Sequence, residues 1–440
     1  MSYKIIDLPA LGRPFNATDI IEVSENGTGS YKANIGDFTL GGENYIFVNS
    51  NGTPAQNGQA VRDAYTAAQA MTPNGAAISY TNRVVILLAP GYYSFNEAVS
   101  GALLINTSFI DFISITGQPD VYFSSIQVLS TFASPINIFL VGIDTTKNNY
   151  YPHAAFAVTT FGVGGENITV KNCVGGNYSF SSFSIGFSGL YENCIGGDYS
   201  FCTTGNATTP PAGILSLATG NFSNYGVIKN CTSGEYSFLS GSDVFPGTIS
   251  NYGNIHNCKS SLGNSFCTSS FRAANYGVIQ DCEGGNYSFC IVIDNVGTGS
   301  SLNAGSIINC QVYLGPGFCI YLGSSFNSTS AENQGLISGC FSAGTLAFVI
   351  NDGPVVGSNS GTIVNCFTTA SMAFCGAFGI NTGIIIECTA QDDAFCSDNA
   401  IGNSGQILRC TLSNGTFTVA APTAPGRVVL GIDTTGVVNF

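Results

Sequence analysis

The feature that most constrains the fold of this chain is a short, repeated phrase that ends in cysteine. The phrase reads Asn-x-Gly-x-Ile-x-x-Cys and is complete at residues 224–231, 251–258 and 275–282. The intervals between successive phrase-ending cysteines are 21, 37, 27, 24, 28, 30, 26, 22 and 22 residues, so the unit has a minimum near 21 residues and grows by insertion. These ten cysteines are Cys173, Cys194, Cys231, Cys258, Cys282, Cys310, Cys340, Cys366, Cys388 and Cys410.

A phenylalanine stands seven or eight residues after each of these cysteines. In six units the next residue is a further cysteine, which accounts for all 16 cysteines of the 440-residue chain. Glycine-containing units of this length, poor in Leu, Ala, Glu and Lys, disfavour helical repeats and are typical of a β-solenoid, whose coils bury apolar surface by stacking. The phenylalanines are Phe180, Phe201, Phe238, Phe266, Phe289, Phe318, Phe348, Phe374, Phe395 and Phe417.

The phrase also predicts how each coil turns a corner. Its isoleucine and cysteine are three residues apart, so a straight strand would place them on opposite faces. The residue before the cysteine is Asn, Asp or Gly in eight of the ten coils, and these types tolerate a left-handed backbone. We therefore expect Ile and Cys both to point inward, and we expect the corner asparagines to form an amide ladder with a spacing of about 4.8 Å. The first of them are Asn172, Asn193, Asn230 and Asn257.

This pattern resembles the pectate-lyase-type right-handed parallel β-helix, and the resemblance covers about residues 43–420. An amphipathic helix is predicted at residues 57–71, with Val61, Ala64, Tyr65 and Ala68 on one stripe, followed by a strand at residues 83–89. In that family such a helix caps the open end of the solenoid. The expected fold class is all-β: a right-handed parallel β-helix with an N-terminal capping helix and a small N-terminal attachment segment.

Four regions follow from this interpretation. They are an attachment segment at residues 1–40, the capping helix and first irregular coils at 41–164, about ten regular coils with Cys, Phe and Asn ladders at 165–420, and a C-terminal cap or tail strand at 421–440.

Residues 1–40 resemble the N-terminal attachment segments of bacteriophage tail fibres and related virion appendages, through the runs at 4–10, 18–23, 26–28 and 31–33. The stretches 45–58 and 83–92 resemble the start of the pectin-lyase-like shaft that such fibres often carry. The resemblance implies a viral protein that is made in the host cytoplasm, resides in the virion and contacts other virion proteins through residues 1–40.

Charge and hydropathy argue against two classes of partner. The chain has 12 Lys and Arg against 26 Asp and Glu, a net charge of −14, and no basic cluster that could attract a nucleic acid. Gly, Asn and Ser interrupt every hydrophobic stretch, so we expect no membrane insertion. Residues 1–13 lack the apolar core of a secretory signal, so we expect a soluble chain made in a cytosol.

Few residues could carry chemistry. The column before the Tyr-Ser-Phe phrase aligns Asn177, Asp198, Glu235, Asn264 and Asn286, which places Asp198 and Glu235 on adjoining coils. One interpretation makes these two an acid/base or Ca²⁺ pair. The other makes them corner residues that asparagine can replace, and the asparagines in the other coils favour it.

The cysteines do not form a metal motif. They include no Cys-x-x-Cys pair and have no histidine partners, so we expect neither a metal nor a cofactor. Neighbouring coils could be bridged by disulfides, but a cytosolic origin favours buried free thiols that pack as small apolar residues.

Two surfaces suggest partners. The outward column that begins with Lys171, Glu192, Lys229 and His256 becomes mostly apolar at Ile308, Val364, Ile386 and Leu408, and a homotrimer would cover that stripe, as is usual in β-helical fibres. The longest insertion, residues 203–223, is polar and could contact a glycan, although a solvated loop is the commoner meaning. Its candidate binding residues are Thr203, Asn206, Thr208, Thr209 and Asn221.

Three functions remain open. The leading hypothesis is a non-enzymatic virion fibre that presents a stiff β-helix for attachment to a host-surface glycan. The second is a polysaccharide depolymerase, a lyase or a glycoside hydrolase, on the same scaffold. The third is a cellular adhesin or filament subunit, which would require an export signal.

Overall fold

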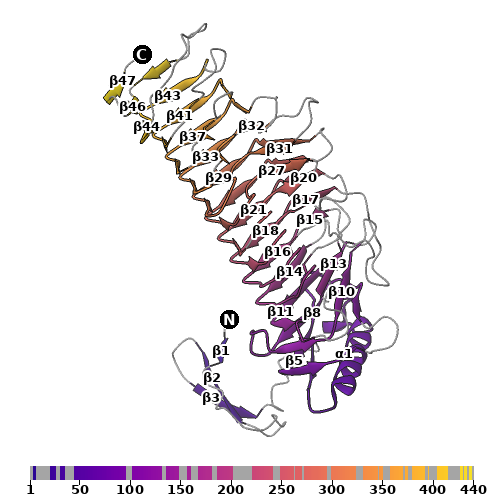
Figure 1. The fold of residues 1–440 in the computed structure, drawn as a ribbon. Helices are drawn as coiled ribbons and strands as arrows, with labels where there is room; N and C mark the ends of the chain where they lie inside the picture. Colours follow the sequence, from indigo (N-terminus) through magenta and orange to yellow (C-terminus); the bar gives the residue numbers. More distant parts are fainter. Residues whose placement is uncertain are drawn as a thin grey trace.

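The chain folds into a β-solenoid of stacked parallel coils (Figure 1). This confirms the predicted all-β class and the parallel stacking. The computed structural model describes residues 3–5, 20–25, 30–34, 44–95, 102–130, 135–147, 156–159, 167–180, 186–201, 221–240, 248–261, 263–269, 272–294, 299–323, 331–344, 346–349, 357–369, 372–374, 379–391, 395, 404–414, 427–429, 431–433 and 436–438.

The largest sheet has fifteen strands, all paired in parallel with the next coil. Ten of them, from β14 to β43, lie in the region where about ten regular coils are predicted. The strands are β4 (Tyr45–Val48), β5 (Val84–Leu88), β8 (Ile110–Ser114), β11 (Asn137–Val141), β14 (Asn167–Lys171), β16 (Leu190–Glu192), β18 (Val227–Lys229), β21 (Asn254–His256), β25 (Val278–Gln280), β29 (Ser306–Ile308), β33 (Leu336–Ser338), β37 (Thr362–Val364), β41 (Ile384–Ile386), β43 (Gln406–Leu408) and β45 (Arg427–Val429).

Two further long sheets run beside this one: a ten-stranded sheet follows it along the chain from the coil of β18 onward, and an eight-stranded sheet precedes it from the coil of β16 to that of β41. The ten-stranded sheet comprises β19 (Thr232–Ser233), β22 (Lys259–Ser260), β26 (Glu283–Gly284), β30 (Gln311–Val312), β34 (Phe341–Ser342), β38 (Phe367–Thr368), β42 (Thr389–Ala390), β44 (Thr411–Leu412), β46 (Gly431–Asp433) and β47 (Gly436–Val438). The eight-stranded sheet comprises β15 (Gly186–Phe187), β17 (Phe222–Asn224), β20 (Thr248–Asn251), β24 (Arg272–Asn275), β28 (Ser300–Asn303), β32 (Ala331–Asn333), β36 (Ser358–Asn359) and β40 (Ile380–Asn381).

Shorter sheets complete the coils. They are β7 (Leu103–Ile105), β10 (Ile126–Leu129) and β13 (Phe156–Thr159); β6 (Gly91–Tyr93), β9 (Val121–Phe123) and β12 (Ile143–Asp144); β23 (Thr268–Ser269), β27 (Ile291–Asp294) and β31 (Tyr321–Gly323); and β35 (Leu346–Ala347) with β39 (Met372–Ala373). Within residues 1–40, β1 (Tyr3–Ile5), β2 (Ile20–Glu25) and β3 (Ser30–Asn34) form an antiparallel sheet.

Helix α1 (Pro54–Gln69) packs against β4, β5, β6 and β8 at the N-terminal end of the solenoid, and the short 3₁₀ helix η2 (Pro73–Gly75) follows it. Helix α1 begins three residues earlier than the predicted 57–71, because Thr53 and Gln56 form a capping box and Pro54 occupies the first turn. It also ends two residues earlier than predicted. The predicted stripe of Val61, Ala64, Tyr65 and Ala68 is buried.

The corner before each cysteine has the predicted left-handed backbone. The φ angles of Asn172, Asn193, Asn230 and Asn257 lie between 49° and 54°, and Glu387 and Arg409, which depart from the Asn, Asp or Gly pattern, share it at 54° and 52°. The side-chain amides form the predicted ladder, because Nδ2 of each asparagine donates to Oδ1 of the one before it at 2.9–3.1 Å. The isoleucine and the cysteine on either side of the corner are both buried.

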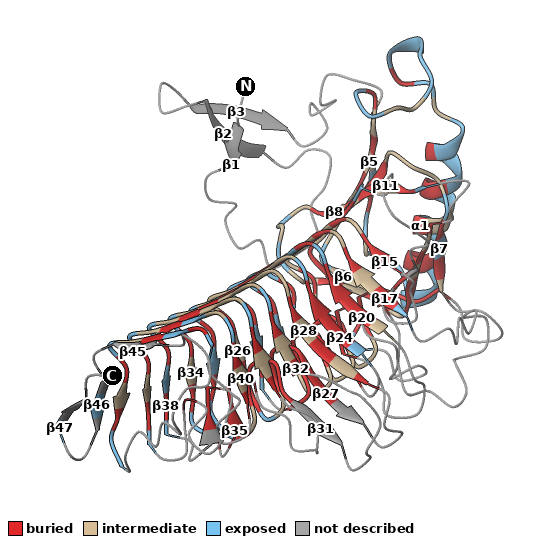
Figure 2. Ribbon diagram, turned by 90° about the horizontal axis from the view of Figure 1, so that it is seen from above, coloured by how far each residue is buried: buried red, intermediate tan, exposed pale blue. Residues whose placement is uncertain are grey.

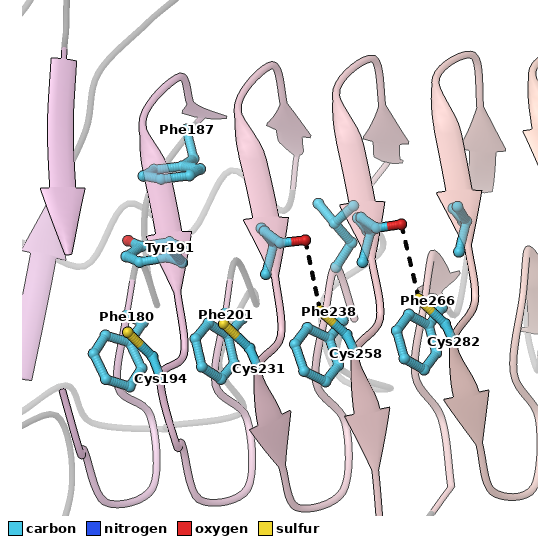
Figure 3. Packing of buried hydrophobic residues seen from close by; sticks show 14 of the residues in the cluster. Phe180, Phe187, Tyr191, Cys194, Phe201, Cys231, Phe238, Cys258, Phe266 and Cys282 are labelled. Carbon is cyan, nitrogen blue, oxygen red and sulfur yellow. Dashed lines mark hydrogen bonds between the residues drawn. The ribbon is translucent and has the colours of Figure 1, made fainter. Parts of the chain in front are cut away.

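The inward-facing strands of the coils are buried (Figure 2), and stacked phenylalanines fill the space between them (Figure 3). Successive ring centroids from Phe180 to Phe395 lie 4.7–5.0 Å apart with interplanar angles of 3–15°. The phenylalanines also have left-handed backbones, with φ between 48° and 69°, which the sequence did not predict. Phe417 lies outside the described residues.

A second asparagine ladder runs through the core. It is formed by the first residue of the repeated phrase, and in it Nδ2 of each asparagine donates to Oδ1 of the next coil's asparagine at 2.7–2.9 Å. All its members are completely buried: Asn224, Asn251, Asn275, Asn303, Asn333, Asn359 and Asn381. The glycine of the phrase lies directly above the glycine of the coil below, since a Cβ on Gly277 would be 2.1 Å from the carbonyl oxygen of Gly253.

The buried and the exposed asparagine ladders should lose different amounts of unfolding free energy when one of their asparagines is replaced. Asn303→Ala should lower the free energy of unfolding by about 2–4 kcal/mol, because it leaves a buried N–H of Asn275 and Oδ1 of Asn333 without their ladder partner. The matched control is Asn230→Gly, which removes an exposed amide but keeps the left-handed corner and should cost about 1 kcal/mol or less. Urea unfolding followed by circular dichroism measures both, and equal losses would contradict the assignment.

Candidate functional site

Asp198 and Glu235, the candidate acid/base or Ca²⁺ pair, meet at a corner between adjoining coils. Oδ1 of Asp198 accepts a 2.8 Å hydrogen bond from the backbone N–H of Glu235. One coil earlier, Oδ1 of Asn177 accepts the backbone N–H of Asp198 at 2.9 Å. The Asp198 carboxylate and the Asn177 amide therefore have the same role, which is to join one corner to the next, and this favours the interpretation of the column as corner residues.

The structure shows that one residue of the predicted column, Asn264, was assigned to it wrongly. The backbone N–H of Tyr236 donates to the carbonyl of Gly263, and the N–H of Asn264 donates to the carbonyl of Asn286. Gly263 therefore takes the place expected for Asn264. The reason is that the stacked phenylalanines set the register, and Gly263 is the residue three positions before Phe266.

Asn264 instead lies in a column of tyrosines. Its φ of 55° matches those of Tyr178, Tyr199 and Tyr236, which are 52–58°. These three rings stack with centroids 4.8 Å apart and interplanar angles of 1–5°. This corner is therefore built from aromatic residues in a left-handed conformation, held in place by their neighbours above and below.

Most of the candidate glycan-binding loop, including Thr203, Asn206, Thr208 and Thr209, lies outside the described residues. Asn221, at its end, is described, and its Oδ1 accepts a 2.7 Å hydrogen bond from the backbone N–H of Thr248. Asn221 thus joins the loop end to the next coil.

The outward column of the fifteen-stranded sheet starts with alternating charges that pair between neighbouring coils. Glu192 binds Lys171 at 2.8 Å and Lys229 at 2.7 Å, one coil on either side. These hydrogen bonds lower the pKa of Glu192, so they stabilise the fold at neutral pH, and that contribution is lost as the pH falls through the lowered pKa. His256 lies 3.1 Å from Asp281, a corner residue of the next coil.

The later part of this column is mostly apolar and only half-buried within the chain. Its apolar members are Ile308, Val364, Ile386 and Leu408, with Ser338 between the first two. Beside it, Ile384 is 38% exposed, and across the corner Phe367 on the ten-stranded sheet is 44% exposed. The apolar surface is therefore wider than the single column that the sequence predicted.

The described cysteines are thirteen free, buried thiols; Cys202, Cys375 and Cys396 lie outside the described residues. The thiol of Cys258 donates to the carbonyls of His256 and Ile228 at 3.3 and 3.6 Å, and the thiol of Cys282 in the next coil repeats this arrangement (Figure 3). Burial raises the pKa of the Cys173, Cys231 and Cys388 thiols, which keeps them protonated and unreactive. The part of the chain that the structure describes contains no cluster of three or more His, Cys, Asp or Glu that could hold a metal ion.

A third aromatic stack lies on the outside of the solenoid. Tyr225, Tyr252 and Tyr276 each follow a buried ladder asparagine, and their rings stack with centroids 5.0 and 4.9 Å apart. The signal was present in the sequence, since the second residue of the phrase is Tyr in three successive coils, but only the structure places the rings in one row, in which Tyr225 is half-buried and the other two are exposed.

Among the described residues, no helix is long and apolar enough to cross a membrane. Comparison of the chain with protein-family models, with curated proteins and with solved structures found no match in any of the three.

The structure predicts the outcome of thiol titration. Denatured, unreduced protein should release close to sixteen thiols to a disulfide reagent, and the native protein should react far more slowly because its described thiols are buried and out of reach of the reagent. Reduced and unreduced samples should titrate alike. A deficit of thiols in pairs in the unreduced sample would reveal disulfides between coils and contradict this prediction.

Proposed function

We propose that this chain is a structural fibre protein, of the kind found in virion appendages, that presents a stiff β-solenoid for attachment to a host-surface glycan. The observation that carries the proposal is the continuity of the internal ladders. Over the described residues, the stack of phenylalanines and the buried chain of asparagine amides both continue from coil to coil. Both resist bending of the solenoid and separation of its coils.

The candidate carboxylates support a structural role over catalysis. The Asp198 carboxylate is already engaged by the backbone of the next coil, in the position that asparagine fills one coil earlier. An attachment protein needs an extended, rigid surface, and repeated coils supply one whose outward residues can vary while the core stays the same.

The exposed apolar surface of the later coils supports assembly with further copies of the chain. Ile308, Val364, Ile386 and Leu408, with Ile384 and Phe367 beside them, leave apolar side chains in water in a monomer. A symmetric homo-oligomer, with the trimer as the leading form, would cover this surface. Residues 1–40 would then join the fibre to other virion proteins.

Glycan attachment without cleavage is the central expectation. The chain, incubated with neutral and anionic polysaccharides from candidate host surfaces, should bind at least one and release neither reducing ends nor unsaturated sugars. Retardation in affinity electrophoresis measures binding, and reducing-sugar and ultraviolet assays measure cleavage. Release of product would establish a depolymerase instead, and binding to none of the polysaccharides would contradict attachment.

Assembly is tested by charges placed on the apolar surface. Ile386→Asp or Leu408→Asp should weaken self-association by about 100-fold or more, because each would bury an unpaired charge in the interface. Asn254→Asp, an exposed outward position of the same sheet in an earlier coil, should leave association unchanged. Light scattering over a concentration series decides this, and a monomeric unaltered chain would refute the interface.

A further inference from the structure

We propose that the outer stack of Tyr225, Tyr252 and Tyr276 is a binding site for a linear, uncharged polysaccharide. This rests on the proposed glycan attachment and deepens it, because it names the class of glycan and moves the expected site from the 203–223 insertion to a regular part of the solenoid.

The three tyrosines lie where the eight-stranded sheet passes into the fifteen-stranded sheet. Each is the single residue between a buried asparagine and the close-packed glycine of the phrase. The rings are nearly parallel, with interplanar angles of 4° and 8°, and Tyr252 and Tyr276 are 47% and 38% exposed. The stack therefore forms a row along the solenoid axis with one tyrosine for each coil.

The core holds this row in place before any ligand arrives. The backbone N–H of Tyr252 donates to the carbonyl of Asn224 at 2.7 Å, and that of Tyr276 donates to the carbonyl of Asn251 at 2.7 Å. Side-chain amides of these same asparagines are joined in the buried ladder. Since little side-chain and backbone freedom remains to be lost, binding by this row has a small entropic cost.

The exposed chemistry of the row suits a carbohydrate. The rings cover one another's faces, so their edges and phenol hydroxyls are what a ligand meets. A phenol hydroxyl both donates and accepts hydrogen bonds, as sugar hydroxyls do, and the ring edge offers apolar contact to C–H groups. Hydroxyls repeated every 4.9–5.0 Å favour a ligand that repeats its own hydroxyls along a line.

The surroundings of the row favour an uncharged ligand. The same column contains no charged residue in its other described coils, where it continues as Ser188, Ala304, Gln334, Ser360, Thr382 and Ser404. Two of the cations on the strands beside the row are paired, Lys229 with Glu192 and His256 with Asp281, while Arg272, at the start of β24, is exposed. The row itself offers no cation to an acidic polysaccharide, and a neutral one has no ionic group to desolvate.

The test uses the full chain and four soluble probes: dextran, mannan and hydroxyethyl cellulose, which are neutral, and alginate, which is anionic. The unaltered chain should bind at least one neutral probe more tightly than alginate. Tyr252→Ala should weaken that binding by about tenfold or more, and Tyr252→Phe, which keeps the stack and removes one hydroxyl, by about fivefold. Affinity electrophoresis gives the dissociation constants, and circular dichroism verifies that each variant is folded.

Tyr313→Ala is the matched control, because Tyr313 is also 47% exposed but lies beside the ten-stranded sheet. It should bind as the unaltered chain does. Undiminished binding by folded Tyr252→Ala and Tyr276→Ala variants would overturn this site and leave glycan attachment standing. Tighter binding to alginate would overturn the uncharged ligand class, and failure of the unaltered chain to bind any neutral probe would overturn the site itself.

Discussion

The interaction on which the structure depends is the stacking of like residues from one coil to the next. Parallel, in-register strands place each side chain about 4.8 Å from its counterpart in the neighbouring coil. A residue type can repeat through successive coils of such a column only if it can pair with itself. Asparagine does so because its amide donates at one end and accepts at the other, and in the buried ladder from Asn224 to Asn381 every asparagine between the two ends uses both.

The same rule explains the low charge of the chain, in which Asp, Glu, Lys and Arg make up only 9% of the residues. Like charges stacked in one column repel each other, so charges are tolerated where their sign alternates. Glu192 between Lys171 and Lys229 shows this arrangement, and Lys259 with Glu283 repeats it across the next sheet. The composition is therefore a consequence of the stacking.

Stacking also stabilises backbone conformations that would otherwise be unfavourable. A left-handed conformation costs a residue with a side chain about 1–2 kcal/mol, and both Tyr178 and Phe180 adopt it within one corner. Burial of a phenylalanine contributes about 2–3 kcal/mol and ring stacking up to about 1.5 kcal/mol more, so each coil can hold the next in this conformation. With the inside occupied by these ladders, the outward columns change most in character along the solenoid: charged at first, apolar later, and aromatic at Tyr225, Tyr252 and Tyr276.

The sequence by itself determined the repeating unit, the inward direction of Ile and Cys, the corner before each cysteine and the phenylalanine stack, because each depends on spacing and residue type within one coil. It also located helix α1 to within three residues. The tertiary structure alone decided the register of Asn264, the buried role of the first asparagine and the need for glycine two residues later. These depend on which atoms of the neighbouring coil lie directly above and below, such as the Gly253 carbonyl that leaves no room for a side chain at Gly277, and spacing along the chain does not specify such contacts.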